Sequence, residues 1–217
     1  MTPALQALLL EAFWETATMV GAAAAIATVL GLPLALLLLV TSPGHIAASP
    51  VVNRPVGVLV NAVRSVPFII LMVAIVPFTR LVAGTSIGTA AATVPLSIAA
   101  TAFIARLFET ALREVDRGLI EAAQAMGASR MQIVSKVLVP EAAPGLVAAV
   151  TVTLVSLVGY SAMAGAVGGG GLGDLGIRFG YQRFMPEVMA VVVGVLILVV
   201  QGLQSLGDVL VRRVSHR

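Results

Sequence analysis

Two stretches of the sequence place hydroxyl, phenol and thioether groups at helical spacing within long apolar segments. Ser156, Tyr160 and Met163 follow one another by four and three residues, so they share one face of a helix. Ser97 and Thr101 share a face in an earlier segment by the same rule. Tyrosine and methionine together suit contact with a flexible thioether chain through sulfur–aromatic and dispersion contacts. These residues could line a path for a solute. The alternative is structural, because Ser and Thr often join membrane helices and Met often fills gaps in a core.

Residue types that most enzyme chemistry needs are missing or isolated. The chain has no cysteine, which excludes disulfides, thiol catalysis and thiolate metal sites. The two histidines, His45 and His216, lie far apart in polar segments without a ligand cluster, and we interpret both as solvated loop residues. The phosphate-binding pattern G-x-x-x-x-G-K-[ST] is also absent. The sequence therefore predicts no catalytic residue, cofactor or metal in this chain.

One glycine pattern imitates a dinucleotide site. The run from Gly171 to Gly176 matches G-x-G-x-x-G. A dinucleotide site needs a preceding strand, a following helix and an acidic residue about 20 positions further on, whereas this run follows an apolar segment. We interpret the glycine-rich stretch 165–176 as a compact loop in which helices approach one another closely.

The elements that must position these residues belong in a membrane. The chain has 217 residues, of which 59% are hydrophobic and 11% charged, and its mean hydropathy is +1.06. Soluble domains carry about 25% charged residues, so this chain cannot cover its surface with polar groups. This excludes a soluble enzyme. The same composition excludes an extramembrane nucleic-acid binder. The pI near 10.2 does not argue for one, because the net charge is only +3 and the basic residues lie near the expected membrane boundaries.

Five segments are long and apolar enough to cross a bilayer, which needs about 20 mostly apolar residues per helix. Backbone polar groups in lipid must be satisfied internally, and continuous apolar runs of this length satisfy them as helices. We therefore expect an all-α, polytopic membrane protein with a single domain over residues 1–217. The spans are expected at about 16–40, 56–78, 85–105, 145–162 and 188–207, after a short amphipathic interfacial lead-in over residues 1–15.

The distribution of Lys and Arg sets the orientation of the spans. An odd number of spans places the two termini on opposite sides of the membrane. With the N-terminus outside, ten basic residues fall on the inner side and three on the outer side, which predicts an outer N-terminus and a cytoplasmic C-terminus. The inner group is Arg54, Arg64, Arg106, Arg113, Arg117, Arg130, Lys136, Arg212, Arg213 and Arg217, and the outer group is Arg80, Arg178 and Arg183.

Arg64 lies inside the second expected span. At the centre of a helix an arginine costs about 2.5–3.5 kcal/mol on insertion scales. Its position about one third of the way along the span favours a guanidinium that reaches the cytoplasmic interface. A role facing a cytoplasmic partner or vestibule is the alternative.

The segment of about 106–140, between the third and fourth spans, holds nine of the 23 charged residues of the chain. Residues 119–126 form a short helix, separated from the preceding one by Gly118 and ended by Gly127 in a left-handed cap. Ser129 and Gln132 form a capping box that begins a second short helix, which Pro140 is expected to end.

The first of these short helices has a small apolar face. Such a face suits docking into the groove of a soluble protein, with packing on the membrane helices as the alternative. The residues that recur at helical spacing are Leu119, Ala122, Ala123 and Met126.

This loop resembles the EAA loop of ABC importer permeases. Glu121-Ala122-Ala123 is followed after three residues by Gly127 and after nine more by Val137-Leu138-Val139-Pro140. The family pattern is Glu-Ala-Ala, a spacer, Gly, nine residues and Ile-x-Leu-Pro, so Val replaces Ile and Val replaces Leu here. Nearly the whole chain is similar to the methionine importer permeases, which have five spans. The runs that carry this similarity are 64–71, 76–80, 84–88, 126–128 and 158–163, the last followed by the glycine run.

The resemblance implies a type I ABC importer permease fold in the bacterial inner membrane. It implies four partners: a second copy of the chain, a cytoplasmic ABC ATPase dimer that binds ATP and Mg, an extracytoplasmic substrate-binding lipoprotein, and the lipid bilayer; nucleic acid is not among them. It implies methionine transport by alternating access. The coupling residues expected are Glu121, Ala122, Ala123, Met126, Gly127 and Pro140, and the pathway or gate residues are Tyr160, Met163, Ser156 and Ser97.

Three other functions are weighed against this one. The same machine could carry a different small polar amino acid. An ATP-independent channel or carrier usually shows buried ionisable residues as relays or ion sites, and these are scarce here. A structural membrane anchor would not need five spans with hydroxyl and glycine groups on their inner faces.

Overall fold

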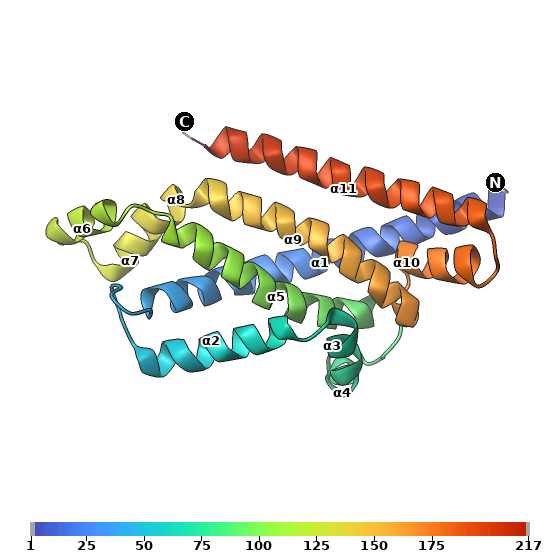
Figure 1. Ribbon diagram of the computed structural model, residues 1–217, viewed down its shortest axis with the longest axis horizontal. Coiled ribbons are helices and arrows are strands. Elements are labelled where there is room, and N and C mark those ends of the chain that lie inside the picture. The colour runs from blue at the N-terminus through green and yellow to red at the C-terminus, as the bar shows by residue number, and fades with distance from the viewer. Residues whose placement is uncertain (1–2, 216–217) are drawn as a thin grey trace.

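The computed structural model describes residues 3–215, and this part of the chain folds into helices without a strand (Figure 1). Four long helices run side by side along the longest axis of the molecule. Each is long and apolar enough to cross a membrane, and they correspond to the first, third, fourth and fifth expected spans. They are α1 (Pro3–Val40), α5 (Thr89–Arg113), α9 (Ala143–Ala164) and α11 (Pro186–Val214).

The first helix, α1, is a single element of 38 residues. No Gly or Pro occurs between residues 4 and 20, and Leu, Ala and Glu in this stretch all favour a helix. The amphipathic lead-in expected over residues 1–15 is therefore not a separate element in its described part, residues 3–15. Its residues form the first turns of the long apolar helix.

The second expected span, residues 56–78, is broken. It corresponds to α2 (Pro50–Ser65) and α3 (Phe68–Ala74), which are bent by 105° to each other, followed by α4 (Val76–Ala83). The bend lies at Val66 and Pro67, because a residue before proline is pushed out of the helical region, and Val66 has φ −85° and ψ 128°. Among the described residues the chain thus has four candidate spans, or five if the bent pair is one span.

The core lies where α1 and α5 cross. Ala23 and Ala27 on α1 are fully buried together with Leu96 and Ile104 on α5. Gly31 faces Ile104 so closely that a Cβ there would overlap the isoleucine side chain. Small residues on α1 therefore allow the two backbones to approach, which is how helices pack when lipid surrounds them.

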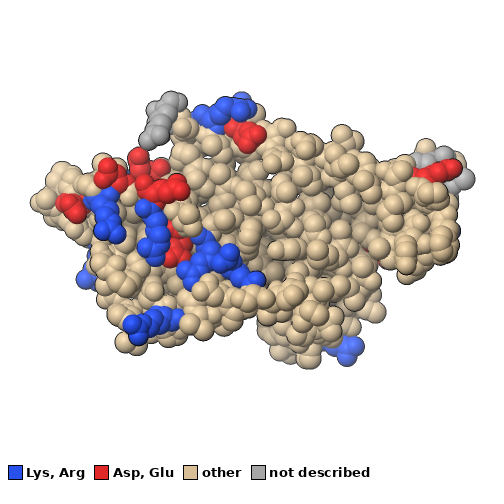
Figure 2. All heavy atoms as spheres, in the orientation of Figure 1, with Lys and Arg blue, Asp and Glu red and all other residues tan. Residues whose placement is uncertain are grey.

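Shorter helices occupy the two ends of the molecule (Figure 1). At one end, between α5 and α9, lie α6 (Arg117–Ala125), α7 (Arg130–Ile133), the π-helical turn η1 (Val134–Leu138) and α8 (Val139–Glu141). At the other end, between α9 and α11, lie η2 (Gly165–Gly169), α10 (Gly171–Leu175) and η3 (Gly176–Tyr181). Figure 2 shows that acidic and basic side chains gather at the α6–α8 end, whereas the body of the molecule is largely uncharged on the face shown.

Candidate functional site

The helix α6 begins with a side-chain cap. Asp116 accepts a hydrogen bond from the backbone N–H of Gly118 at 2.7 Å, and α5 has already ended at Arg113. The break between the two helices therefore lies at residues 114–116. Gly118, which was expected to break the helix, lies inside the first turn of α6, because the aspartate cap starts the helix before it.

The apolar face expected on α6 is divided between the core and the surface. Ile120 and Ala123 are buried against the core that α1, α5 and α9 share. Leu119, Ala122 and Met126, spaced by three and four residues, lie on the exposed side, and Met126 is 82% exposed. One side of α6 thus fixes it to the membrane helices, and the other presents a free apolar stripe, which we call the α6 stripe.

The end of α6 is a Schellman motif built around Gly127. The Gly127 N–H donates to the Gln124 carbonyl at 2.9 Å, and the Ala128 N–H donates to the Ala123 carbonyl at 3.0 Å. Gly127 has φ +79°, and a Cβ built there would meet no atom within 4 Å. The requirement for glycine is therefore conformational and not steric. Glu121 lies exposed on α6.

The capping box expected at the start of the next helix is present. The Ser129 N–H donates to the Gln132 side chain at 2.7 Å, and the Gln132 N–H donates to the Ser129 hydroxyl at 3.4 Å. Ile133 and Leu138 then enter the same core as α1, α5 and α9. The whole α6–α8 segment is therefore capped at its turns and packed onto the long helices.

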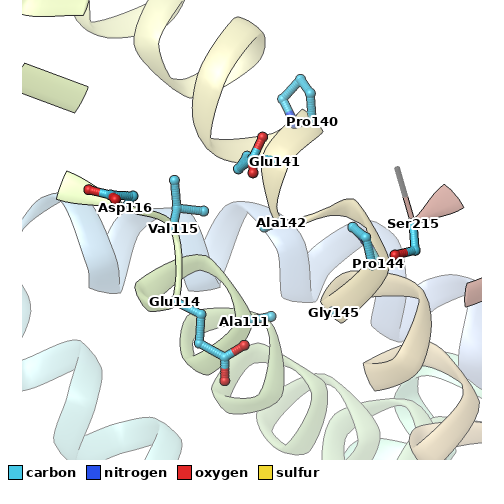
Figure 3. Close-up of a pocket in the computed structure, with 10 residues that line it drawn as sticks. All are labelled: Ala111, Glu114, Val115, Asp116, Pro140, Glu141, Ala142, Pro144, Gly145 and Ser215. Carbon is cyan, nitrogen blue, oxygen red and sulfur yellow. The ribbon is translucent and has the colours of Figure 1, made fainter. Parts of the chain in front are cut away.

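Pro140 was expected to end the second short helix, and this prediction is wrong. Pro140 lies within α8. The π-helical turn η1 precedes it, and the Val139 N–H donates back to the Val134 carbonyl. A wider turn of this kind shifts the register of backbone hydrogen bonds, so the missing N–H and the ring of Pro140 are accommodated. Pro140 lines a cavity of about 440 Å³ with Glu114, Asp116 and Glu141 (Figure 3).

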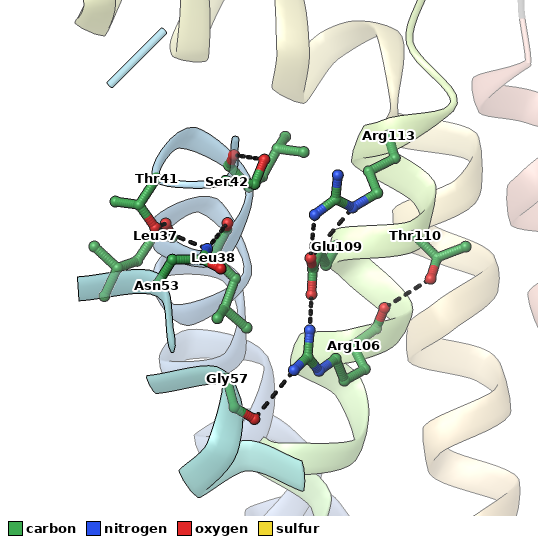
Figure 4. A network of polar contacts seen from close by, with 11 residues as sticks. Leu37, Leu38, Thr41, Ser42, Asn53, Gly57, Arg106, Glu109, Thr110 and Arg113 are labelled. Atoms are coloured by element: carbon green, nitrogen blue, oxygen red, sulfur yellow. Dashed lines mark hydrogen bonds and ion pairs between the residues drawn. The ribbon is translucent and has the colours of Figure 1, made fainter. Parts of the chain in front are cut away.

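A charged network links α5 to α2 next to this segment (Figure 4). The side chain of Glu109 is only 7% exposed and accepts hydrogen bonds from Arg106 at 2.6 Å and from Arg113 at 2.7 Å. Arg106 also donates from Nη2 to the backbone carbonyl of Gly57 on α2 at 3.2 Å. Sequence reasoning missed this network. The signal for it is the spacing of Arg106, Glu109 and Arg113 by three and four residues, which places them on one helix face.

A second polar contact joins α1 to α2. The Asn53 side-chain amide donates to the Leu38 carbonyl at 2.7 Å and to the Thr41 hydroxyl at 3.0 Å. These bonds satisfy a carbonyl near the end of α1 that has no partner in its own helix. Together with Arg106 and Gly57, they fix the start of α2 between α1 and α5.

The loop between α1 and α2 places His45 beside α6. A cavity of about 360 Å³ is lined by His45, Arg117 and Glu121, and the Nδ1 of His45 is buried without a hydrogen-bond partner among the described residues. Burial lowers the pKa of His45 below its ordinary value, and the positive charges of Arg113 and Arg117 lower it further. The expectation of a freely solvated histidine is therefore wrong for His45, and His216 lies outside the described residues.

The candidate pathway residues on α9 share one face, as the spacing predicts. Tyr160 stacks on Phe68 at the start of α3, with ring centroids 4.9 Å apart and an interplanar angle of 11°. Met163 is exposed, and Ser156 is partly exposed with its hydroxyl bonded to the Val152 carbonyl at 2.9 Å. The three side chains thus lie along a face that is open in the single chain.

Ser97 lies elsewhere. It is 7% exposed, and its hydroxyl donates to the Thr93 carbonyl of its own helix at 2.7 Å. It lines an apolar groove of about 520 Å³ bounded by α1, α2, α4 and α5, and none of the three α9 residues lines this groove. The structure therefore does not bring Ser97 together with Ser156, Tyr160 and Met163.

The glycine-rich stretch is a tightly packed helical segment. The Gly171 N–H donates to the Glu15 carboxylate at 2.6 Å, and the Leu172 N–H donates to the Thr16 hydroxyl at 2.9 Å. A Cβ on Gly173 would overlap the backbone of Ala162. Helix α9, and no strand, precedes the G-x-G-x-x-G run, which fits close helix packing and not a dinucleotide site.

No group of three or more His, Cys, Asp or Glu side chains that could hold a metal ion occurs among the residues that the structure describes. Two surfaces of the described chain could contact other molecules: an exposed apolar stripe beside charged groups at the α6–α8 end, and a polar and aromatic face on α9.

Comparisons with known proteins agree with this arrangement. The family model for the binding-protein-dependent transport system inner membrane component matches residues 44–217. A Vibrio cholerae protein described as a probable D-methionine transport system permease protein MetI is 56% identical over 210 residues, which cover 97% of this chain and 93% of that protein. The Escherichia coli K12 D-methionine transport system permease protein MetI is 56% identical over 158 residues, 73% of each chain.

Two solved structures are similar over nearly the full length. A chain from the inward facing conformations of the MetNI methionine ABC transporter is 51% identical, with a TM-score of 0.97 over 100% of both chains. A chain from an amino acid ABC transporter with histidines is 18% identical, with a TM-score of 0.78 over 96% of this chain and 94% of that one. The second likeness shows the fold alone.

Proposed function

The chain belongs to the family of binding-protein-dependent transport system inner membrane components, and from this membership we propose that it is the permease subunit of an ATP-driven methionine importer. The observation that carries this proposal is the match to a chain of the MetNI methionine ABC transporter, at 51% identity and a TM-score of 0.97 over the whole of both chains. As a transport subunit it moves the substrate, and ATP and Mg²⁺ bind to partner ATPase subunits.

In the proposed topology the single permease domain crosses the bacterial inner membrane five times, with α2 and α3 together forming the second crossing. The N-terminus lies outside, and the α6–α8 end lies in the cytoplasm with the coupling loop of about 106–140. The charge distribution supports this orientation, because Arg117, Arg130 and Lys136 lie in the α6–α8 segment. Arg178 and Arg183 lie near α10 at the opposite end.

The proposed contact with the ATPase is the α6 stripe. Leu119 and Met126 supply apolar area to a groove of the partner, and Ala122 between them lets the partner approach the helix backbone. Glu121 lies exposed beside the stripe and would pair with a basic group of the partner. Gly127 makes the tight turn that ends α6.

Movement of α6 is proposed to reach the spans as a rigid displacement. Ile120 and Ala123 on α6, with Ile133 and Leu138 after it, belong to the same buried core as α1, α5 and α9. The network of Arg106, Glu109 and Arg113 extends this connection to α2 through the Gly57 carbonyl. A well-packed core transmits displacement because it does not deform continuously.

The proposed transport cycle is alternating access by two copies of the chain. ATP binding closes the ATPase dimer and rocks the two permeases from an inward-open to an outward-open state. Hydrolysis and product release reset them, while a substrate-binding lipoprotein delivers methionine from the outer side. The similarity to a transporter solved in inward facing conformations supports the assignment of this structure to the inward-facing state.

The substrate pathway is proposed to follow the open face of α9. Tyr160 and Met163 offer an aromatic ring and a thioether to the side chain of methionine, and Ser156 offers a hydroxyl. Ser97 is nearly buried and bonded to its own helix, so we leave it outside the pathway.

Uptake in living cells tests the proposal. Cells that lack their own methionine importer receive this chain with its ATPase and binding protein, and uptake of labelled methionine is measured against a panel of unlabelled amino acids. Saturable uptake that only methionine-like compounds inhibit is expected. Uptake of another amino acid in place of methionine would favour the same machine with a different substrate. Uptake that survives without the ATPase subunit would favour an ATP-independent carrier.

A further inference from the structure

Arg64 is a charged residue near the bend in the second span, and it is not among the proposed pathway residues. It lies one residue before the end of α2, immediately ahead of the 105° bend into α3. Its side chain is exposed, and it makes no hydrogen bond or ion pair with any other residue in the described range 3–215. An exposed and unpaired guanidinium is common where a protein surface faces water. Whether Arg64 needs another explanation therefore depends on how deep in the membrane it lies.

Arg64 lies at the level of the apolar middle of the bundle. The contact between Arg106 and the Gly57 carbonyl places Gly57 beside the charged network, and Arg64 is seven residues further along α2, about 10 Å at 1.5 Å per residue. Its neighbour Val63 lines the apolar groove together with Val94 on α5. A guanidinium at this depth is strongly disfavoured in hydrocarbon, and charged groups inside membrane proteins face the interior of a bundle or a water-filled cavity.

The face of α2 that carries Arg64 is polar. Asn61, Arg64 and Ser65 are spaced by three and four residues, and all three are exposed in the single chain. Val60 and Val63, on the adjoining side of α2, line the apolar groove, so Arg64, four residues after Val60, lies at the border between the groove and the polar face. Polar and charged side chains at membrane depth are costly against lipid, so an aqueous cavity completed by a second copy of the chain is the environment that suits this face of α2.

The bend joins this polar face to the candidate pathway. Phe68 follows Arg64 by four residues across the bend and stacks on Tyr160 of α9. The last carbonyls of α2 also stabilise a positive charge at its end, since the C-terminus of a helix carries a partial negative charge. A cation therefore lies close in the chain to the aromatic pair that is proposed to contact the thioether of the substrate.

We propose that Arg64 binds the carboxylate of the amino acid substrate as it passes, with Asn61 beside it as an uncharged polar neighbour. A guanidinium presents paired N–H donors that match the two oxygens of a carboxylate. This inference rests on the proposed function, because it names the substrate group that the pathway recognises. It also replaces the expectation that Arg64 only reaches the membrane interface.

The absence of cysteine from the sequence allows a direct test. Arg64→Cys is assembled with the ATPase in proteoliposomes supplied with the binding protein and ATP, and initial uptake of labelled methionine is measured. Each complex is then treated with a positively charged aminoethyl methanethiosulfonate or with the neutral methyl reagent. The wild-type complex is treated in parallel, so that any effect on the partner proteins is subtracted. Arg212→Cys, an exposed arginine on α11, is the matched control.

We expect Arg64→Cys to lower initial uptake about tenfold or more, as loss of a charge-assisted contact does. The positive reagent should restore much of it and the neutral reagent should not, while Arg212→Cys stays within about twofold of wild type. Normal uptake by Arg64→Cys, no reaction of the cysteine with either reagent, or equal effects of the two reagents would each overturn the inference.

Two further comparisons separate this inference from other failures. If wild-type complexes take up no methionine, this result contradicts the proposed function of the whole chain. It does not bear on Arg64 alone. If Arg64→Cys does not assemble, Arg64→Lys and Arg64→Gln are compared at equal amounts of assembled complex. Uptake by the lysine variant above that of the glutamine variant supports carboxylate binding, and equal uptake contradicts it.

Discussion

The guanidinium of Arg106 donates to the backbone carbonyl of Gly57 at 3.2 Å and so ties the helix that leads to α6 to the helix that ends at the 105° bend. The same guanidinium is held by Glu109 at 2.6 Å, and Glu109 is held in turn by Arg113 at 2.7 Å. One nearly buried carboxylate thus orients two cations between the α6–α8 end and the membrane helices.

Removing the charge of Glu109 should loosen this connection. Glu109→Gln leaves two arginines without their counter-charge, and we expect the free energy of unfolding to fall by about 2 kcal/mol. This loss is smaller than that on breaking a fully buried ion pair, because both arginines are partly exposed. Thermal unfolding of the purified complex measures it. Glu187→Gln, an exposed carboxylate at the start of α11, is the control and should change stability by less than about 0.5 kcal/mol. Equal effects of the two variants would contradict a special role for the network.

The turn at Gly127 should tolerate asparagine far better than valine. Gly127 has φ +79° with open space around it, and a left-handed backbone costs a residue with a Cβ about 1–2 kcal/mol, least for Asn. We expect Gly127→Val to insert in the membrane but to lose most methionine uptake, and Gly127→Asn to keep most of it. The matched control is Gly202→Val on α11, where the backbone is helical and an added Cβ would meet no atom within 4 Å. Wild-type uptake by Gly127→Val would show that the turn does not matter for coupling.

A charge on the α6 stripe should block association with the ATPase. Met126 is 82% exposed, and Met126→Glu would place a carboxylate in the proposed apolar contact, where an unpaired charge is costly. We expect co-purification of the ATPase to fall about tenfold or more, which corresponds to a loss of at least about 1.4 kcal/mol. Met131, 74% exposed on α7, provides the control substitution Met131→Glu. Equal losses from both variants would mean that the contact is not confined to α6.

The stack of Phe68 on Tyr160 should act as a unit that holds α3 against α9. A double-mutant cycle with Phe68→Leu and Tyr160→Leu should show a coupling free energy of about 0.5–1.5 kcal/mol in the unfolding of the complex. Additive effects of the two substitutions would show that the rings do not stabilise each other.

Acid should destabilise the α1–α2 loop through His45. Burial, with Arg113 and Arg117, lowers the pKa of His45 in the folded chain below its ordinary value, so protonation favours the unfolded chain. The stabilising contribution is present above the ordinary pKa of about 6.5 and is lost as the pH falls through the lowered pKa. We expect the Tm of the wild-type complex to fall between about pH 7 and pH 5 more steeply than that of His45→Asn. Parallel pH profiles of the two complexes would contradict this assignment.

Local signals in the sequence predicted the features that depend on neighbouring residues. The left-handed cap at Gly127 and the capping box of Ser129 and Gln132 follow from backbone sterics and short side-chain contacts. The four long helices follow from apolar length alone. The break before Pro67 also has a local signal, because a residue before proline is disfavoured in a helix. A count of apolar residues over 56–78 does not include this signal, so it predicts one continuous span.

Features that depend on residues far apart in the sequence were not predictable in this way. The stacking of Phe68 on Tyr160 and the contact of Arg106 with Gly57 require knowledge of which helices pack together. Spacing placed Ser97 on a helix face but could not say that this face borders an apolar groove away from α9. The π-helical turn that accommodates Pro140 has no simple sequence signal of its own.

Accumulation of labelled methionine by proteoliposomes tests the central claim most directly. The vesicles contain this chain with its ATPase subunit, receive the binding protein outside, and hold either ATP or a non-hydrolysable analogue inside. We predict concentrative uptake with ATP alone, inhibited by unlabelled methionine and not by unrelated amino acids, and lost when Met126→Glu replaces the wild-type chain. Equal accumulation with the analogue, or uptake that Met126→Glu leaves unchanged, would contradict transport driven through α6.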